Sequence, residues 1–280
     1  MKKIIAILLS SLMLVSALAL SSCGDESSES NGGEGKKVLT MATNANFPPY
    51  EYMEGNEFAG IDVEIAGELA KKLGMTLKIE NVEFGSIIGG VQSGKYDMGM
   101  AGMTVTDERK ESVNFTNTYA KGIQSVIVKE GSEYTCVDDF YNKDAEGKYV
   151  SVKEGVKIAV QQDTTGDIYA SDTVANWGFG QENVLRYKNG ADAILALTTG
   201  KCVAVIIDNE PAKSFVKENE GLKILDGSYT DEDYAICVNK DNAKLLEDLN
   251  KALEELKADG TIDKIINKYI PADSAESKAE

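Results

Sequence analysis

The stretch "GGVQSGKYDMGMAGMT" (residues 89–104) has a counterpart later in the chain, "LALTTGKCVAVIIDNE" (residues 195–210). Both run from a helix-like segment through Gly-Lys into an apolar strand. Gly102 comes eight residues after Gly94, and Asp208 comes eight residues after Gly200. A helix followed by glycine and a strand is common, so this match alone is weak. Together with the order of the neighbouring segments, it predicts two similar α/β lobes.

The segments around both stretches alternate between strand-like and helix-like patterns. "KVLTMAT" (37–43) and "TLKIENV" (76–82) are strand candidates, and "GIDVEIAGELAKKLG" (60–74) has the spacing of an amphipathic helix. Asp62 is a candidate N-cap of that helix, and Gly74 stands at its end. "VKIAVQQ" (156–162) and "GDIYASDTV" (166–174) restart the pattern. This βαβαβ order predicts an α/β fold in which each lobe is a mainly parallel sheet flanked by helices.

The first 36 residues predict export. Lys2 and Lys3 precede an apolar run over 4–20, and "LALSSC" resembles a bacterial lipobox that ends on Cys23. We therefore predict a lipoprotein signal peptide over 1–23 with a lipid on Cys23, and a flexible tether over 24–36. The apolar run is also long enough to serve as an uncleaved membrane anchor, which is the alternative. Residues 273–280 are predicted to form a disordered tail.

Composition narrows the classes of function. The chain of 280 residues has a formal net charge of −17, which disfavours nucleic acid as a partner. It has no histidine, so the commonest general base and metal ligand is missing, and no phosphate-binding loop appears. We expect neither a metal nor a cofactor. Cys202 and Cys237 lie in apolar runs, which favours buried free thiols, while any pairing that involves Cys136 stays open.

Two opposite charges are expected at the carboxyl ends of strands, where ligands bind in open α/β sheets. The first stretch leads into Arg109, and the second reaches Asp208. Arg109 falls in the first turn of a helix expected from Thr106, where acids are the norm, so we expect an anion to approach it. An amino acid offers a carboxylate to the one charge and an ammonium to the other. The plainer alternatives are a surface Arg109 paired with Glu108 or Glu111, and an Asp208 that only caps a turn.

Several separate motifs, in order, resemble one known family. The chain is similar to the extracellular amino-acid-binding proteins of ABC importers (solute-binding protein family 3). The matching motifs are "LTMATNANFPPYEY", "GIDVEIAGELAKKLG", "VEFGSIIGGVQSGKYDMGMAGMTVTDERKESVNFT", "VQQDTTGD", "AVIIDNEPA" and "YAICVNKDN". The resemblance implies two lobes, 37–122 with 232–272 and 123–231, joined by crossings near 119–123 and 230–234. The C-terminal segments 241–260 and 261–270 would then return to the first lobe. Periodicity predicts both as helices, the first with a stripe of Leu245, Leu246, Leu249, Leu253 and Leu256.

The resemblance also implies a ligand site. Arg109 would bind the α-carboxylate with a bidentate fork, Thr104 would add a hydroxyl donor, and Asp208 would accept the ammonium. The other implied site residues are Ala101 and Gly102 at the main-chain end, Thr165 and Gly166 as donors at a helix start, Phe47 and Phe84 on either side of the ligand side chain, and Asn44 and Gln161 at its polar end. The phenylalanines could equally be core residues, and the threonines could be helix caps.

We therefore predict the substrate-binding component of an ABC importer. A lipid-anchored monomer at the extracellular face of the cytoplasmic membrane would capture a free, polar L-amino acid and deliver it to a permease. Two aromatic rings suit the stem of arginine or lysine as well as glutamine, but the uncharged Asn44 argues against a basic ligand. One alternative is a secreted dehydratase- or hydrolase-like enzyme using Glu51, Asp163 or Glu210 as the acid or base. The other is a ligand-sensing module.

Overall fold

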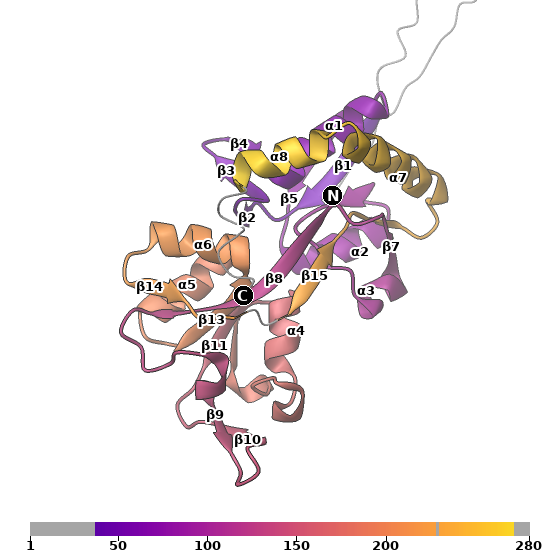
Figure 1. Ribbon diagram of the computed structural model, residues 1–280. Helices are drawn as coiled ribbons and strands as arrows, with labels where there is room; N and C mark the ends of the chain where they lie inside the picture. The colour runs from indigo at the N-terminus through magenta and orange to yellow at the C-terminus, as the bar shows by residue number, and fades with distance from the viewer. Residues whose placement is uncertain (1–36, 228–229, 272–280) are drawn as a thin grey trace, which may run out of the picture. The chain divides into compact units, whose positions relative to one another are not determined.

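Figure 1 shows the computed structural model of the chain, which describes residues 37–227 and 230–271. The predicted signal peptide, the lipid on Cys23, the tether and the C-terminal tail lie outside the described residues. Within the described part of the chain, every helix is too short or too polar to cross a membrane.

The first of two main sheets has five strands. Their order is β5 (Thr76–Asn81), β1 (Val38–Thr43), β6 (Met98–Gly99), β16 (Cys237–Asn239) and β7 (Val113–Phe115). β5, β1 and β6 are parallel, and β16 is antiparallel to both β6 and β7. Four strands therefore share one direction, and only β16 is reversed.

The second sheet repeats this arrangement. Its strands follow the order β12 (Val184–Tyr187), β11 (Ile158–Gln161), β13 (Ala204–Asp208), β8 (Ala120–Lys129) and β14 (Leu222–Ile224), with β15 (Asp231–Tyr234) beside the start of β8. β12, β11 and β13 are parallel, and β8 is antiparallel to β13 and β14. One reversed strand next to an edge strand thus occurs in both sheets. The prediction of two similar, mainly parallel α/β units is confirmed.

The two stretches that suggested the repeat occupy equivalent places. Gly94 follows α2 (Ile87–Gln92) and Gly200 follows α5 (Gly190–Thr198), with φ of +75° and +76°. Glycine adopts this left-handed conformation after a helix more readily than other residues. The chain then enters β6, which pairs with β1, and β13, which pairs with β11. Each stretch therefore adds the third parallel strand of its sheet.

Helices cover both faces of each sheet (Figure 1). Besides α2 and α5, they are α1 (Ile61–Lys72), α3 (Asp107–Ser112), α4 (Thr165–Ser171), α6 (Asn209–Glu218), α7 (Ala243–Ala258) and α8 (Thr261–Tyr269). In the first sheet Leu39 packs with α1, α7 and α8, whereas Ala42 packs with α2. In the second sheet Ile207 packs with α5 and α6, whereas Ile206 packs with α4. The alternation follows the pleat of the strands.

Smaller elements complete the fold. Two antiparallel pieces are β2 (Asn46–Phe47) with β3 (Glu51–Glu54) and β4 (Glu57–Ala59), and the hairpin of β9 (Tyr141–Lys143) and β10 (Tyr149–Val152). The short 3₁₀ helices are η1 (Phe84–Ser86), η2 (Val137–Phe140), η3 (Val174–Asn176) and η4 (Gln181–Asn183).

β8 and β15 run antiparallel to each other between the two sheets (Figure 1). Their register pairs Ala120 with Tyr234 and Ile123 with Asp231. The predicted crossings near 119–123 and 230–234 fall on this strand pair. After it, the chain returns to the first sheet through β16, and α7 and α8 pack against α1.

The start of α1 differs from the prediction. Its N-cap is Gly60, and Asp62 is the second helical residue. The Asp62 carboxylate instead accepts hydrogen bonds from the Gly102 backbone N–H and the Tyr119 hydroxyl, both at 2.8 Å, because a buried carboxylate requires donors. The other end agrees with the sequence, since Gly74 follows the helix with φ of +67°.

Two further predictions are confirmed in the core. Cys202 and Cys237 are buried and free, and Cys136, which is half-buried, is also free. The leucine stripe of α7 buries Leu249, Leu253 and Leu256 against the first sheet.

Candidate ligand-binding site

The carboxyl ends of strands from both sheets meet at one enclosed space, here called the crevice. Asn44 follows β1, Gln161 ends β11 and Asp208 ends β13. Twelve residues line the crevice: Asn44, Phe47, Glu51, Phe84, Ala101, Gly102, Thr104, Arg109, Gln161, Thr164, Thr165 and Asp208. The structure thus brings together ten of the eleven predicted site residues. The exception is Gly166, which lies one residue deeper in α4 against Gln124 and Ile206.

The crevice is shut. The space inside it that the centre of a water molecule can occupy is about 10 Å³, which leaves room for about one water. Pockets that hold small molecules usually measure roughly 300–1,000 Å³. An amino acid can therefore enter only if the lining residues move apart.

Among the described residues, four polar contacts near the crevice join the first sheet's side to the second sheet's side, in addition to the bond of Tyr234 to Asp208. They are Gln161 Nε2 to Asn44 Oδ1 at 3.0 Å, Arg109 to the Asp163 carbonyl at 3.1 Å, the Thr104 and Thr165 hydroxyl oxygens at 3.4 Å, and the exposed ion pair of Lys188 and Glu83 at 2.6 Å. The first three lie at the crevice itself. Separating the two sides breaks all four.

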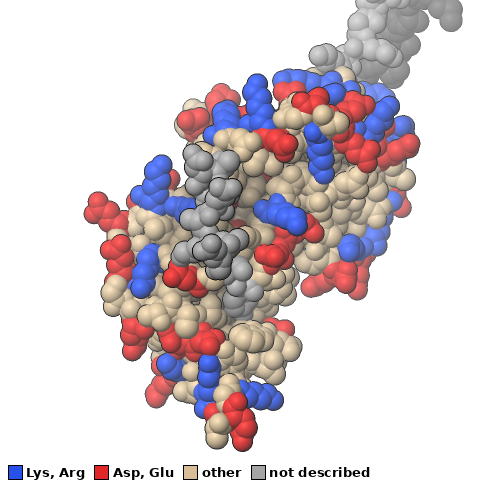
Figure 2. All heavy atoms as spheres, viewed as in Figure 1, with Lys and Arg blue, Asp and Glu red and all other residues tan. Residues whose placement is uncertain are grey.

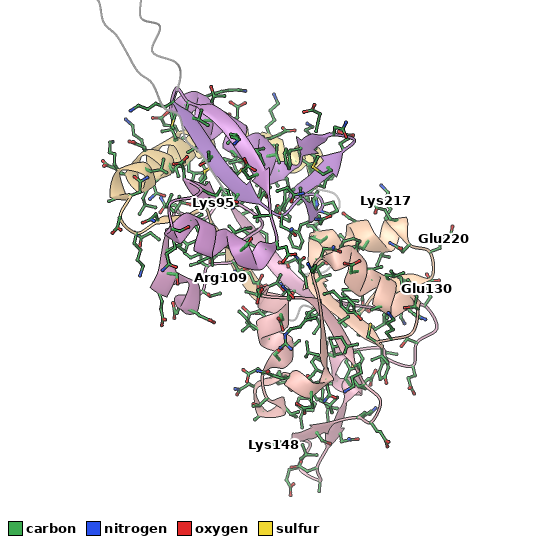
Figure 3. All side chains as sticks on the ribbon, turned by 180° about the vertical axis from the view of Figure 1, so that it is seen from behind. Lys95, Arg109, Glu130, Lys148, Lys217 and Glu220 are labelled. Carbon is green, nitrogen blue, oxygen red and sulfur yellow. The ribbon has the colours of Figure 1, made fainter. Side chains whose placement is uncertain are left out.

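Local structure places Arg109 at the crevice. Thr106 is the N-cap of α3, and its hydroxyl accepts a hydrogen bond from the Arg109 backbone N–H at 3.1 Å. This fixes Arg109 in the first turn, as predicted, and its side chain is buried with 7% exposure. Figure 3 shows Arg109 at the junction of the two halves, whereas Lys148 and Glu220 lie at the outer edge.

The guanidinium of Arg109 is held without an acid. It donates to the carbonyl of Thr104 at 2.7 Å and to that of Asp163, and it lies over the Phe84 ring, 5.3 Å from the centroid. Burial lowers the pKa of Arg109, and the negative charge of Glu232 opposes this effect. Among the described residues, no carboxylate forms an ion pair with Arg109, so the alternative of a surface pair with Glu108 or Glu111 is wrong.

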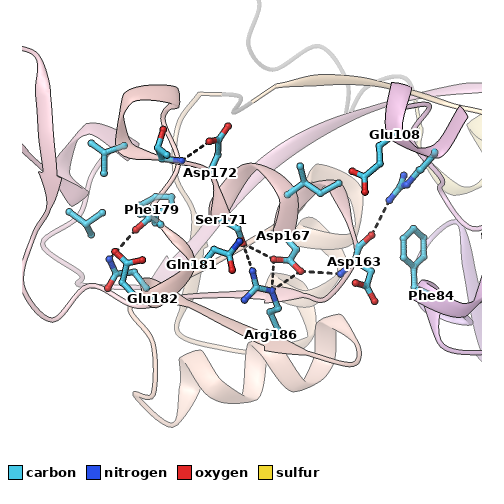
Figure 4. A pocket seen from close by; sticks show the side chains of 18 of the residues that line it. Phe84, Glu108, Asp163, Asp167, Ser171, Asp172, Phe179, Gln181, Glu182 and Arg186 are labelled. Atoms are coloured by element: carbon cyan, nitrogen blue, oxygen red, sulfur yellow. Dashed lines mark hydrogen bonds and ion pairs between the residues drawn. The ribbon is translucent and has the colours of Figure 1, made fainter. Parts of the chain in front are cut away.

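An open groove of about 1290 Å³ adjoins the crevice, and both are lined by Phe84 and Arg109. Figure 4 shows how its far wall is built: Arg186 pairs with Asp167 at 2.9 Å, and Asp167 accepts a hydrogen bond from the Asp163 backbone N–H at 3.1 Å. Asp163 has a left-handed φ of +64°. The Asp167 bond holds this turn so that the Asp163 carbonyl reaches Arg109.

Asp208 supplies the opposite charge. It occupies the N-cap position of α6, but its side chain makes no capping bond and accepts a hydrogen bond from the Tyr234 hydroxyl. Burial raises the pKa of Asp208 to about 8, and the neighbouring Glu232 adds to the rise. The plain cap reading is therefore wrong for this side chain. A buried carboxyl group that lines a ligand crevice is suited to a cationic partner, which would compensate its charge.

The sequence of the chain matches one family over most of its length. Residues 39–272 match the model of the bacterial extracellular solute-binding proteins, family 3. The chain belongs to this family. This family 3 protein is similar over nearly its whole length to the arginine-binding extracellular protein ArtP of Bacillus subtilis. The two sequences are 33% identical over 92% of this chain and 96% of ArtP.

Two further comparisons support the family 3 fold. The glutamine-binding protein GlnH of an ABC transporter from Bacillus subtilis is 30% identical, over 99% of this chain and all of GlnH. A solved structure, described as an ancestral arginine-binding protein bound to arginine, superposes with a TM-score of 0.73 at 36% identity. That match covers 84% of this chain and 98% of the other.

Two of the predicted site residues of this family 3 protein already use their donor groups. The N–H of Gly102 is bound by Asp62, and the hydroxyl of Thr104 donates to Glu232 Oε2 at 2.8 Å. In the shut arrangement neither group is a free donor toward the crevice, and the roles of both residues toward a ligand stay predictions. The reason is that Asp62 and Glu232 are buried acids and take up the nearest donors.

The other lining residues have double roles. Phe47 packs against Tyr50, with ring centroids 6.1 Å apart, and also lines the crevice, so it is both a core and a site residue. Asn44 donates from Nδ2 to the Val82 carbonyl at 2.7 Å, which leaves its Oδ1 for Gln161. The role of these residues toward a ligand stays a prediction.

Several acids and phenols near the site were not among the predicted ligand contacts, although Glu51 was named for the enzyme alternative. Glu51 lines the crevice, and burial together with Asp62 raises its pKa well above the usual range. Burial also raises the pKa of Asp62, to about 6, although its hydrogen bonds lower it. Glu232 and Tyr234 lie behind the crevice in "TDEDY", a run that looks like solvated surface. The letters of this run show no alternation of polar and apolar residues, so the burial of Glu232 and Tyr234 had no local signal in the sequence.

Proposed function

We propose that this protein is the substrate-binding component of an ABC importer, which captures a free, polar L-amino acid and delivers it to a membrane permease. One observation carries the proposal. The cation Arg109, on α3, and the acid Asp208, at the end of β13, are both more than nine-tenths buried and line one crevice. A zwitterion fits between two such groups, and the family membership supports this reading.

The lobes of the proposal are 37–122 with 232–272, and 123–231. In the mechanism, the α-carboxylate binds Arg109 in the first lobe, and the α-ammonium binds Asp208 in the second. Only the closed form makes both contacts, so ligand shifts the population toward closure. Release requires the cross-crevice contacts to open again.

The lining of the crevice favours a polar ligand side chain. Phe47 and Phe84 offer flat apolar surfaces, and the amides of Asn44 and Gln161 offer donors and acceptors at the far end. Relatives are named for arginine and for glutamine. Uncharged amides suit glutamine and do not by themselves balance a guanidinium.

Location and assembly follow from the same proposal. The protein works outside the cytoplasmic membrane, and a lipid on Cys23 keeps it near the permease. It acts as a monomer, without metal or cofactor.

The proposed function makes and breaks no covalent bond of the ligand. An amino acid incubated with the protein for hours should therefore be recovered unchanged, as measured by mass spectrometry. Conversion of the ligand would instead favour the enzyme alternative.

A thermal-shift screen of the twenty free amino acids tests the proposal directly. A ligand at 100 times its Kd stabilises the folded state by about 2.7 kcal/mol, which gives a clear rise in Tm. We expect a small set of polar amino acids to raise Tm. If none of the twenty does so, the proposed function is wrong.

Arg109→Ala provides the matching test on the site. Losing one partner of a buried ion pair costs about 3–5 kcal/mol, or roughly a hundred- to several-thousand-fold in affinity at ~1.4 kcal/mol per decade. We expect calorimetry to detect little or no binding by a variant that still unfolds cooperatively. Near-normal affinity would rule out the assigned role.

A further inference from the structure

A second buried acid lies beside Asp208. Glu232, on β15, is 5% exposed, and its Oε2 accepts hydrogen bonds from Thr104 Oγ1 at 2.8 Å and Gln124 Nε2 at 3.1 Å. Its other oxygen, Oε1, is buried and has no hydrogen-bond partner among the described residues. None of the ligand contacts proposed above uses Glu232.

Strand register places Glu232 next to Asp208. Gln124 stands opposite Asp208 in the β8–β13 ladder, and the same glutamine donates to Glu232. Tyr234, two residues after Glu232 on the same face of β15, donates its hydroxyl to Asp208. The two acids, here called the carboxyl pair, therefore lie side by side. After burial, Glu232 is the largest cause that raises the pKa of Asp208.

The surroundings offer the carboxyl pair little positive charge. Arg109 is the cation that acts on both acids, but its guanidinium bonds to the backbone carbonyls of Thr104 and Asp163. The other titratable groups of the described chain that interact with the pair are acids or phenols, namely Tyr50, Glu51, Tyr169 and Tyr234, while the partly exposed Lys213 is paired with Glu210 at 2.6 Å. Two carboxyl groups that share such a site do not both ionise readily at neutral pH.

We propose that Asp208 holds a proton beside Glu232 before ligand binds, and that the α-ammonium group of the amino acid displaces this proton. The inference rests on the proposed function. The proton leaves a carboxyl O–H for the solvent, the carboxylate so formed accepts N–H bonds from the ammonium, and no other bond changes. A cation beside an acid lowers its pKa by about 1–3, which is enough to drive the release near pH 7.

Isothermal titration calorimetry of the full chain tests this coupling. L-arginine, L-glutamine and the amino acid with the largest thermal shift are each titrated at pH 7 in phosphate and in Tris, which have different ionisation enthalpies. The difference in heat gives the number of protons released. We expect release of about 0.5–1 proton per bound amino acid, and an affinity that rises by up to about tenfold per pH unit between pH 6 and 8. All ligands should release the same number, because they share the ammonium group.

Glu232→Gln tests the contribution of the second acid while leaving the rest of the site in place. Glutamine keeps the shape and can still accept from Thr104 and Gln124, but it leaves Asp208 without a second acid. We expect this variant to release fewer protons than the wild type at pH 7 and to have a shallower pH profile, because burial alone still raises the pKa of Asp208. Asp233→Asn is the matched control, since Asp233 is the next residue on β15 and its side chain is exposed. It should release protons like the wild type.

The outcomes distinguish this inference from the proposed function. Binding by the wild type without proton release, or equal release by Glu232→Gln and wild type, would overturn the inference and leave the function standing. Failure of all twenty amino acids to bind would overturn both. The wild-type titration is decisive even if the variant does not fold.

Discussion

At the scale of single residues, Gly102, in the turn after β6, occupies a position where any residue other than glycine would be strained. Its φ is +49°, and an added Cβ would lie 2.8 Å from the Phe47 ring. Its N–H also binds the buried Asp62 carboxylate. Conformation, packing and hydrogen bonding therefore coincide at one position that lines the crevice.

Gly102→Ala should destabilise the protein by about 2–4 kcal/mol, from left-handed strain of about 1–2 kcal/mol plus the overpacking of Phe47. Urea unfolding measures the change. Gly89→Ala is the matched control, because Gly89 lies inside α2 with no atom within 4 Å of an added Cβ. Alanine there should stabilise by roughly 0.5–1 kcal/mol. Equal effects of the two substitutions would contradict the account of Gly102.

Asp208 should lower the stability of the unliganded protein as pH rises. Its pKa is about 8 in the folded state and 3.8 when unperturbed, so between these values the folded state binds more protons than the unfolded state. The contribution of Asp208 to the free energy of unfolding is therefore largest below about pH 4 and declines toward pH 8.

Asp208→Asn should remove this decline. We expect the variant to be more stable than the wild type by ~2 kcal/mol or more at pH 8, and to differ less at pH 5. Urea unfolding at the two pH values tests the prediction, with Asp233→Asn as the exposed control. A variant that is less stable than the wild type at pH 8 would argue against a strained carboxyl group.

At the scale of elements, α3 depends on its cap. The helix has six residues, too few for stability on its own, and its first turn carries Arg109. The hydroxyl of Thr106 binds the Arg109 backbone N–H directly. The cap therefore stabilises the helix and positions the guanidinium at the same time.

Thr106→Ala should cost about 1 kcal/mol of stability and weaken amino-acid binding several-fold, whereas Thr106→Ser should restore both. Denaturation and calorimetry on the two variants provide the readouts. If alanine lowers stability but leaves the affinity unchanged, the cap does not position Arg109.

At the scale of the whole molecule, the shut crevice is held by few contacts. The buried bond of Gln161 to Asn44 and the exposed ion pair of Lys188 and Glu83 both cross it. Figure 2 shows acidic and basic side chains interspersed on the visible face, without a patch of one sign among the described residues.

Gln161→Ala should shift the unliganded ensemble toward the open form. A net hydrogen bond is worth about 1 kcal/mol, which corresponds to roughly a fivefold change in the open-to-closed ratio. Small-angle X-ray scattering would report the shift as an increase in radius of gyration. Lys188→Ala is the control, because an exposed ion pair contributes only about 0–1 kcal/mol. A larger shift from Lys188→Ala than from Gln161→Ala would contradict this ranking.

Much of the fold could be read from local patterns. The spacing from Gly94 to Gly102 and from Gly200 to Asp208 led to two equivalent strand ends, and the periodicity of 243–258 led to a helix with a buried leucine stripe. Local reasoning failed at Asp62, taken for a cap, and at the "TDEDY" run, taken only for a crossing. Both contain acids whose partners lie far away in the sequence, and no local pattern carries that information.

The sequence by itself determined which segments become strands and helices, because periodicity and glycine positions act over a few residues. It also placed Asp208 at a strand end, where ligands bind, and Arg109 in the first turn of the helix that begins after Thr106. The tertiary structure alone decided that these ends meet in one shut crevice, that Asp62 and Glu232 take donors expected to face the ligand, and that Glu232 lies beside Asp208. Burial and the pairing of distant strands set those contacts, since the energy of a buried charge depends on every group packed around it.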